Sequence, residues 1–70
     1  MSSFFSEGSK INFNGIKGNV IKITETYRKN VLVVKIIECP GRFSRHLSTG
    51  ITIGLFEFPD GTLEFMSIIE

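Results

Sequence analysis

The chain has 70 residues, of which 41% are apolar, and a formal net charge of +1. This length allows one small domain, 1–70, with a limited core, and the single Cys excludes an intramolecular disulfide. No stretch reaches the length of a membrane span and the N-terminus lacks a basic signal region, so we expect a cytoplasmic protein that does not enter a membrane.

The basic and acidic residues are unevenly distributed along the chain. All eight Lys and Arg precede residue 46, whereas four of the seven acids follow it. This asymmetry favours a fold with one positive and one negative side, suited to an anionic ligand or to contact between copies. The alternative is a surface on which the two sets pair and cancel. The near-zero net charge argues against a strongly basic nucleic-acid-binding protein.

Five segments rich in Ile, Val, Phe and Thr follow an N-terminal segment, residues 1–8. Such segments, each bounded by Gly, Pro, Asn or charged residues, are typical of β-strands, and no window has the apolar stripe and caps of a helix. We therefore predict an all-β fold: a five-stranded small barrel or a strongly twisted antiparallel meander. The predicted strands are residues 10–13, 19–27, 30–38, 50–58 and 62–70.

Three short connections carry turn signals. Residues 14–18 contain two glycines for positions of positive φ, and residues 27–30 end in an asparagine suited to a left-handed position. Residues 58–62 contain Pro-Asp-Gly, which predicts a tight hairpin with Gly61 as the left-handed residue of a bulge.

Residues 8–23 contain a glycine, a short apolar strand, a glycine-rich turn and a Gly-x-Val-x-x-Ile segment, in that order. The positions that carry this order are Gly8, Ile11, Phe13, Gly15, Lys17, Gly18, Val20 and Ile23. The order resembles the opening of KOW-type, SH3-like small β-barrels. The resemblance implies an SH3-like barrel that binds RNA, DNA, or ribosomal and polymerase proteins through loops at one end.

Residues 31–37 are apolar at both alternating sets of positions, so both faces of this strand need cover. In the last hairpin Leu55 is expected to pair with Phe65 on one face. The residues expected on the other face are Phe56, Phe58 and Met66. Two arrangements remain open. The second set is buried within the domain, by a bent strand or under the N-terminal segment or the long loop, or it forms an interface, which predicts a homodimer or a bound protein partner.

The connection at residues 39–50 is longer than a simple strand reversal needs, which predicts a functional loop. It contains Arg42, Phe43, Arg45 and His46, and cationic groups beside an aromatic ring are suited to phosphate binding with base stacking. Because two arginines are few for a nucleic-acid contact, the loop would need support from other cations. The supporting residues expected are Lys17, Lys22 and Lys35. The alternative is a loop that packs on the barrel through Phe43 and Leu47, with its arginines solvated.

Catalytic and metal chemistry is not indicated. Cys39 and His46 lack an orienting third group and an oxyanion site, and their spacing does not match structural zinc. We therefore expect no enzyme activity, no cofactor and no small-molecule substrate. The predicted function is a small interaction module that self-associates and binds a protein partner as an adaptor, regulator or inhibitor. The alternative is a regulator that binds RNA or DNA.

Overall fold

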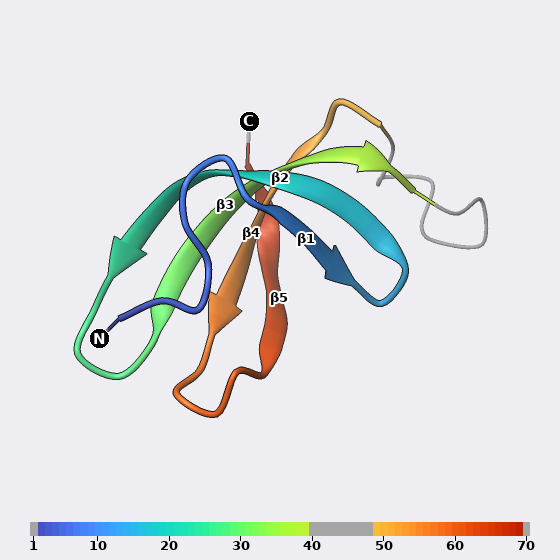
Figure 1. Cartoon of the computed structure of the whole chain (residues 1–70). Helices are drawn as coiled ribbons and strands as arrows, with labels where there is room; N and C mark the ends of the chain where they lie inside the picture. The colour runs from blue at the N-terminus through green and yellow to red at the C-terminus, as the bar shows by residue number, and fades with distance from the viewer. Residues whose placement is uncertain (1, 40–48, 70) are drawn as a thin grey trace.

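The five strands form one antiparallel sheet in the order in which they occur in the chain (Figure 1). The computed structural model describes residues 2–39 and 49–69, and this part contains strands and no helix. The strands are β1 (Lys10–Phe13), β2 (Ile16–Glu25), β3 (Asn30–Glu38), β4 (Thr52–Glu57) and β5 (Leu63–Ile69). The predicted all-β meander is confirmed.

The sheet is strongly curved but open (Figure 1). Within the described residues β1 pairs with β2 alone and β5 pairs with β4 alone, so the two edges do not join into a barrel. Register shifts between Val20 and Lys22 and between Gly54 and Leu55 mark bulges, which increase the twist and bend of a strand. Of the two predicted forms, the twisted meander is the one observed.

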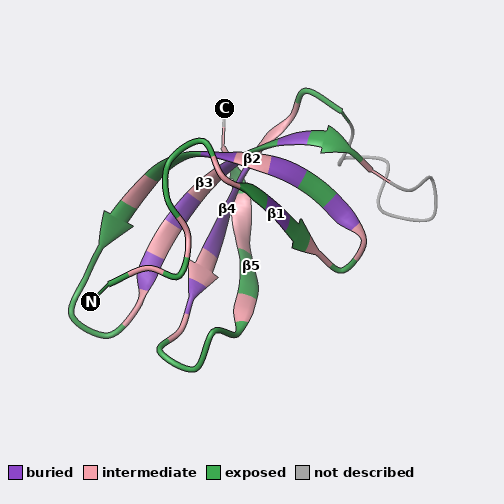
Figure 2. Ribbon diagram, viewed as in Figure 1, coloured by how far each residue is buried: buried purple, intermediate pink, exposed green. Residues whose placement is uncertain are grey.

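The core lies on one face of this curved sheet, which we call the inner face. Buried and less buried residues alternate along β3, as expected for a strand with one face turned to the core, whereas in β4 Gly54 of the opposite face is buried as well (Figure 2). Half-buried Phe5, from the N-terminal segment, and Phe13 pack against the core. The buried apolar residues are Ile11, Ile16, Val20, Leu32, Val34, Ile36, Ile53 and Leu55.

The β1–β2 turn is shorter than the predicted segment 14–18. Asn14 and Gly15 form it with φ values of 52° and 89°, as in a two-residue type I′ turn, and β2 begins at Ile16. Gly18 therefore lies inside β2, where a Cβ atom would lie 2.5 Å from Val34 Cγ1 and 2.7 Å from the Lys35 carbonyl oxygen. Gly18 allows close approach of β2 to β3, and the prediction that it takes positive φ in a turn is wrong.

The β4–β5 hairpin follows the prediction. Gly61 has a φ of 89°, its N–H donates to the Phe58 carbonyl at 2.9 Å, and the Thr62 N–H donates to Asp60 Oδ1 at 2.9 Å. The other turn differs, because Asn30 does not take the left-handed position expected for it. Asn30 instead is the first residue of β3 and is fully buried.

The N-terminal segment is attached to the inner side of the sheet by a buried carboxylate. Glu57 accepts hydrogen bonds from Ser3 Oγ at 2.6 Å, from the Phe4 N–H at 2.8 Å and from Asn30 Nδ2 at 3.1 Å. Burial alone raises the pKa of Glu57, but these three hydrogen bonds outweigh burial and hold the pKa below its ordinary value. The carboxylate thus joins three separate parts of the chain.

Candidate binding surface on the outer face of the sheet

The face opposite the core, which we call the outer face, is divided between charged and apolar side chains. Lys35 is exposed between buried Val34 and Ile36, and the cross-strand partners of Lys35 share its face. Because the sheet curves around its core, the outer face is convex (Figure 1). The binding and interface residues that were predicted on strands lie on this face: Lys17, Lys22, Lys35, Phe56 and Met66.

Lysines gather on the part of the outer face formed by β1, β2 and β3. Lys10 lies opposite Asn19, and Asn19 lies opposite Lys35, so the three residues form one row across the sheet. Lys17 is two residues from Asn19, and Lys22 lies opposite Val33, two residues from Lys35. We call Lys10, Lys17, Lys22 and Lys35 the lysine surface. The structure therefore brings together all three of the predicted supporting lysines.

One acidic side chain partly neutralises the lysine surface. Lys17 Nζ lies 3.8 Å from Glu38 Oε2, and this exposed pair is the one salt bridge within the described residues. Both residues of this pair precede residue 46. Within the described residues, therefore, the basic residues before position 46 form no salt bridge with the acidic residues after it. A shallow hollow of about 400 Å³ adjoins the pair and is lined by Lys10, Ile11, Asn12, Lys17, Ile37 and Glu38.

Apolar side chains cover the part of the outer face formed by β3, β4 and β5. Val31 lies opposite Phe56, and Val33 lies opposite Gly54. A Cβ atom at Gly54 would lie 2.4 Å from Met66 Cε and 3.2 Å from Ile69 Cδ1, so these two side chains lie over the glycine. We call Val31, Val33, Phe56, Met66 and Ile69 the apolar surface, and each of them is half-buried.

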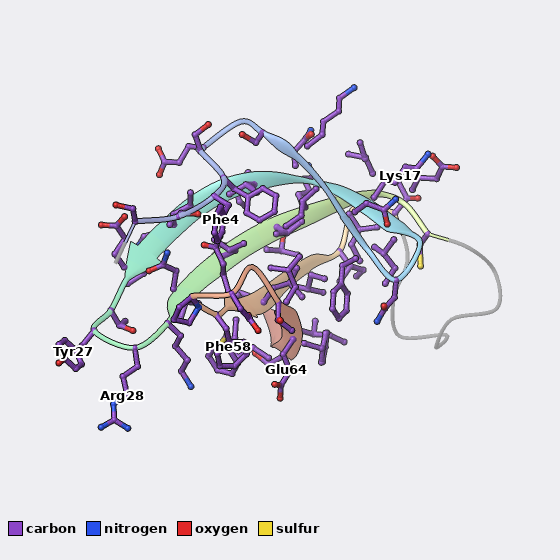
Figure 3. The ribbon with its side chains drawn as sticks, turned by 60° about the horizontal axis from the view of Figure 1, so that its bottom comes forward. Phe4, Lys17, Tyr27, Arg28, Phe58 and Glu64 are labelled. Carbon is purple, nitrogen blue, oxygen red and sulfur yellow. The ribbon has the colours of Figure 1, made fainter. Side chains whose placement is uncertain are left out.

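The predicted interface residues lie on this surface or beside it. The Phe56 and Phe58 rings are 6.4 Å apart at their centroids, and Lys29 Nζ lies 3.9 Å from the Phe56 centroid. This cation–π contact holds the β2–β3 turn against β4. Tyr27 and Arg28, by contrast, project from the same turn away from the sheet (Figure 3).

The predicted loop site cannot be placed on this surface, because Arg42, Phe43, Arg45 and His46 lie outside the described residues. Cys39, at the start of the loop, is half-buried and packs against the core. The described residues hold no group of three or more His, Cys, Asp or Glu side chains that could bind a metal ion.

Two features were missed from the sequence. Lys10 was not assigned to a site, although its place next to Ile11 in a short strand signals the face opposite the core. The Glu57 cluster had no sequence signal, because its donors Ser3, Phe4 and Asn30 are far from Glu57 in the chain.

Comparison with known proteins adds no relative: no family model, curated protein or solved structure matches the chain. Among the described residues, no helix has the length and apolar character needed to cross a membrane. The candidate surfaces must therefore be interpreted from their own geometry.

Proposed function

We propose that this chain is a non-catalytic interaction module that self-associates through the β4–β5 side of its sheet and binds a protein partner as an adaptor, regulator or inhibitor. The observation that carries the proposal is the apolar surface, which continues to an edge strand, β5, with one side of its backbone unpaired within the described residues. Apolar patches of this kind, next to polar surroundings, are typical of protein–protein contacts.

The sequence of β5 supports pairing with another strand. Edge strands of soluble proteins usually carry lysine, proline or other features that prevent pairing between molecules. The seven residues of β5 contain no Lys, Arg or Pro. Phe65 and Ile68, which lie opposite Leu55 and Ile53 on the inner face, are still 40% and 39% exposed. The features of β5 that oppose pairing are a bulge opposite Gly54 and Leu55 and the charge of Glu64.

A second copy of the chain is the partner that fits this edge best. The β5 strands of two copies can pair with each other around a two-fold axis. Such a contact uses the same edge of both molecules, so the assembly stops at a dimer. An axis through the middle of β5 places the two Glu64 side chains at opposite ends of the paired strands, so the one charge within β5 does not oppose itself. A domain of about this size buries a smaller fraction of its surface than a larger domain does, so surface buried between two copies adds usefully to its stability.

Sedimentation velocity over a wide concentration range tests the proposal. We expect the wild type to change from monomer to dimer as concentration rises, and Ile68→Lys to remain monomeric, because a lysine at an edge strand opposes pairing. Phe58→Lys is a second variant at the edge of the apolar surface, in case Ile68→Lys does not fold.

Tyr27→Lys is the matched control, because Tyr27 is 92% exposed on a turn remote from β5. This variant should form the dimer as the wild type does. A wild type that is monomeric at every concentration would remove the proposal of self-association.

A further inference from the structure

The lysine surface is a feature that self-association through β5 does not use. Its four lysines come from β1, β2 and β3, whereas the proposed dimer contact involves β5 at the other edge of the sheet. Within the described residues, Lys17 forms a salt bridge with Glu38. The other three lysines form none: Lys10, Lys22 and Lys35. The surface therefore keeps an uncompensated positive charge of about three.

The spacing of the lysines suits a chain of phosphates. Neighbouring strands are about 4.8 Å apart, so the backbones of Lys10 and Lys35, at the two ends of their row, are separated by about 10 Å. Long lysine side chains adjust their ammonium groups over several ångströms around such positions. The row and its diagonal neighbours thus offer several cations along one path over a convex face.

The groups between the lysines distinguish a nucleic acid from a lipid surface. A protein that binds a membrane through a basic face usually inserts large apolar or aromatic side chains beside the cations. Here Asn12 and Asn19 lie among the lysines. The exposed apolar side chains nearby are two aliphatic ones, Ile21 at 51% and Ile37 at 42% exposure, with no aromatic ring among the described residues of the surface. Amides that can contact sugar or phosphate, without an aromatic side chain to insert into a membrane, suit a nucleotide chain better than a bilayer.

We infer that the lysine surface binds the phosphate backbone of a nucleic acid without sequence preference, with Lys10, Lys22 and Lys35 as the principal contacts. Aromatic rings are absent among the described side chains of this surface, so stacking contributes little and electrostatic attraction dominates. The contact resides on the strands and does not require the loop of residues 39–50.

The test is fluorescence anisotropy with labelled oligothymidine, repeated with a labelled DNA duplex. With about three phosphates neutralised, the wild-type affinity for the single strand should fall about 20-fold between about 50 and about 200 mM salt. The variant Lys10→Gln/Lys22→Gln/Lys35→Gln should bind at least about tenfold more weakly at the lower salt and should lose most of this salt dependence.

A second variant controls for the change in net charge. Arg28→Gln/Lys29→Gln removes two positive charges from the β2–β3 turn, outside the lysine surface, and is compared with Lys10→Gln/Lys35→Gln, which removes two charges from the surface. The turn variant should retain most of the affinity and the salt dependence. Circular dichroism and thermal unfolding confirm that each variant folds as the wild type does.

Three results would overturn the inference. One is a wild type that binds neither nucleic acid at low salt. The second is a turn variant, Arg28→Gln/Lys29→Gln, that loses as much affinity as Lys10→Gln/Lys35→Gln, which would assign the contact elsewhere. The third is tighter binding to phosphatidylserine vesicles than to either nucleic acid, which would make a lipid surface the ligand. None of these results depends on whether the protein dimerises.

Discussion

The inner and outer faces of the sheet are built from alternate residues of the same strands, yet they differ in how completely they are covered. On β3, the inner residues Leu32, Val34 and Ile36 are no more than 2% exposed. The outer residues Val31 and Val33 are half-buried, and Ile37 is 42% exposed. Apolar composition alone therefore does not identify the core. The core is the face that the N-terminal segment covers and around which the sheet curves.

The sharpest comparison of the two faces uses adjacent valines of β3. Val34→Ala removes two buried methyl groups and should lower the free energy of unfolding by about 2–3 kcal/mol. Val33→Ala makes the same chemical change at a half-buried position and should cost about half as much or less. Urea unfolding of both variants measures the difference. Equal losses would show that the outer face is as well enclosed as the inner face.

Two glycines provide the next comparison. A methyl group at Gly18 would meet the Lys35 carbonyl oxygen at 2.7 Å, and that backbone atom cannot move without disturbing the β2–β3 pairing. Gly18→Ala should therefore lower stability by about 1–3 kcal/mol.

Gly54→Ala is the counterpart on the outer face. Its methyl group meets the flexible end of Met66 at 2.4 Å, which can turn aside. Thermal unfolding should show a smaller loss than for Gly18→Ala. A larger loss at Gly54 would mean that the apolar surface is rigidly packed.

The buried carboxylate gives a pH-dependent difference. Glu57→Gln should cost about 1–2 kcal/mol at neutral pH, because the charged acceptor of three hydrogen bonds is lost. The pKa of Glu57 is lower in the folded protein than in the unfolded chain, so its contribution is complete above the ordinary carboxyl pKa. The contribution is lost as pH falls through the lowered folded-state pKa.

Urea unfolding at neutral and acid pH measures this effect. The stability gap between wild type and Glu57→Gln should narrow as pH falls. Glu64→Gln, at an exposed position of β5, is the control and should show no comparable gap. A gap that is independent of pH would indicate that the Glu57 carboxylate does not carry the effect.

The smallest effect on stability is expected for the lysine surface. Lys10, Lys22 and Lys35 are exposed and make no salt bridge within the described residues, so their replacement by Gln should change the free energy of unfolding by less than about 0.5 kcal/mol each. Thermal unfolding checks this expectation. A large loss would show that these lysines support the fold, and would weaken their assignment to binding.

Local sequence patterns predicted most of the fold. The limits of β1 and β3 and the Pro-Asp-Gly hairpin were predicted correctly, because strand alternation and turn chemistry are encoded in neighbouring residues. The role of Gly18 could not be read locally, since the close approach that requires it involves β3. The Glu57 cluster also depends on chain segments that meet only in the folded protein.

The candidate sites were predicted in part. Lys17, Lys22 and Lys35 were predicted as cations that support the loop, but only the strand register places them with Lys10 on one face. Phe56, Phe58 and Met66 were expected to form an interface, and their half-buried positions leave that prediction to experiment. The KOW-type resemblance and the role of the 39–50 loop also remain predictions, since the residues that would decide the loop's role lie outside the described part.

The most direct test of the account is amide hydrogen exchange of the wild type at low and high protein concentration. If two copies join through β5, amides of β5 that are unpaired in the monomer should exchange more slowly as concentration rises. Amides on the unpaired side of β1, at the other edge of the sheet, should exchange at the same rate throughout. Exchange of β5 that is unaffected by concentration would contradict the central claim that this edge is the site of self-association.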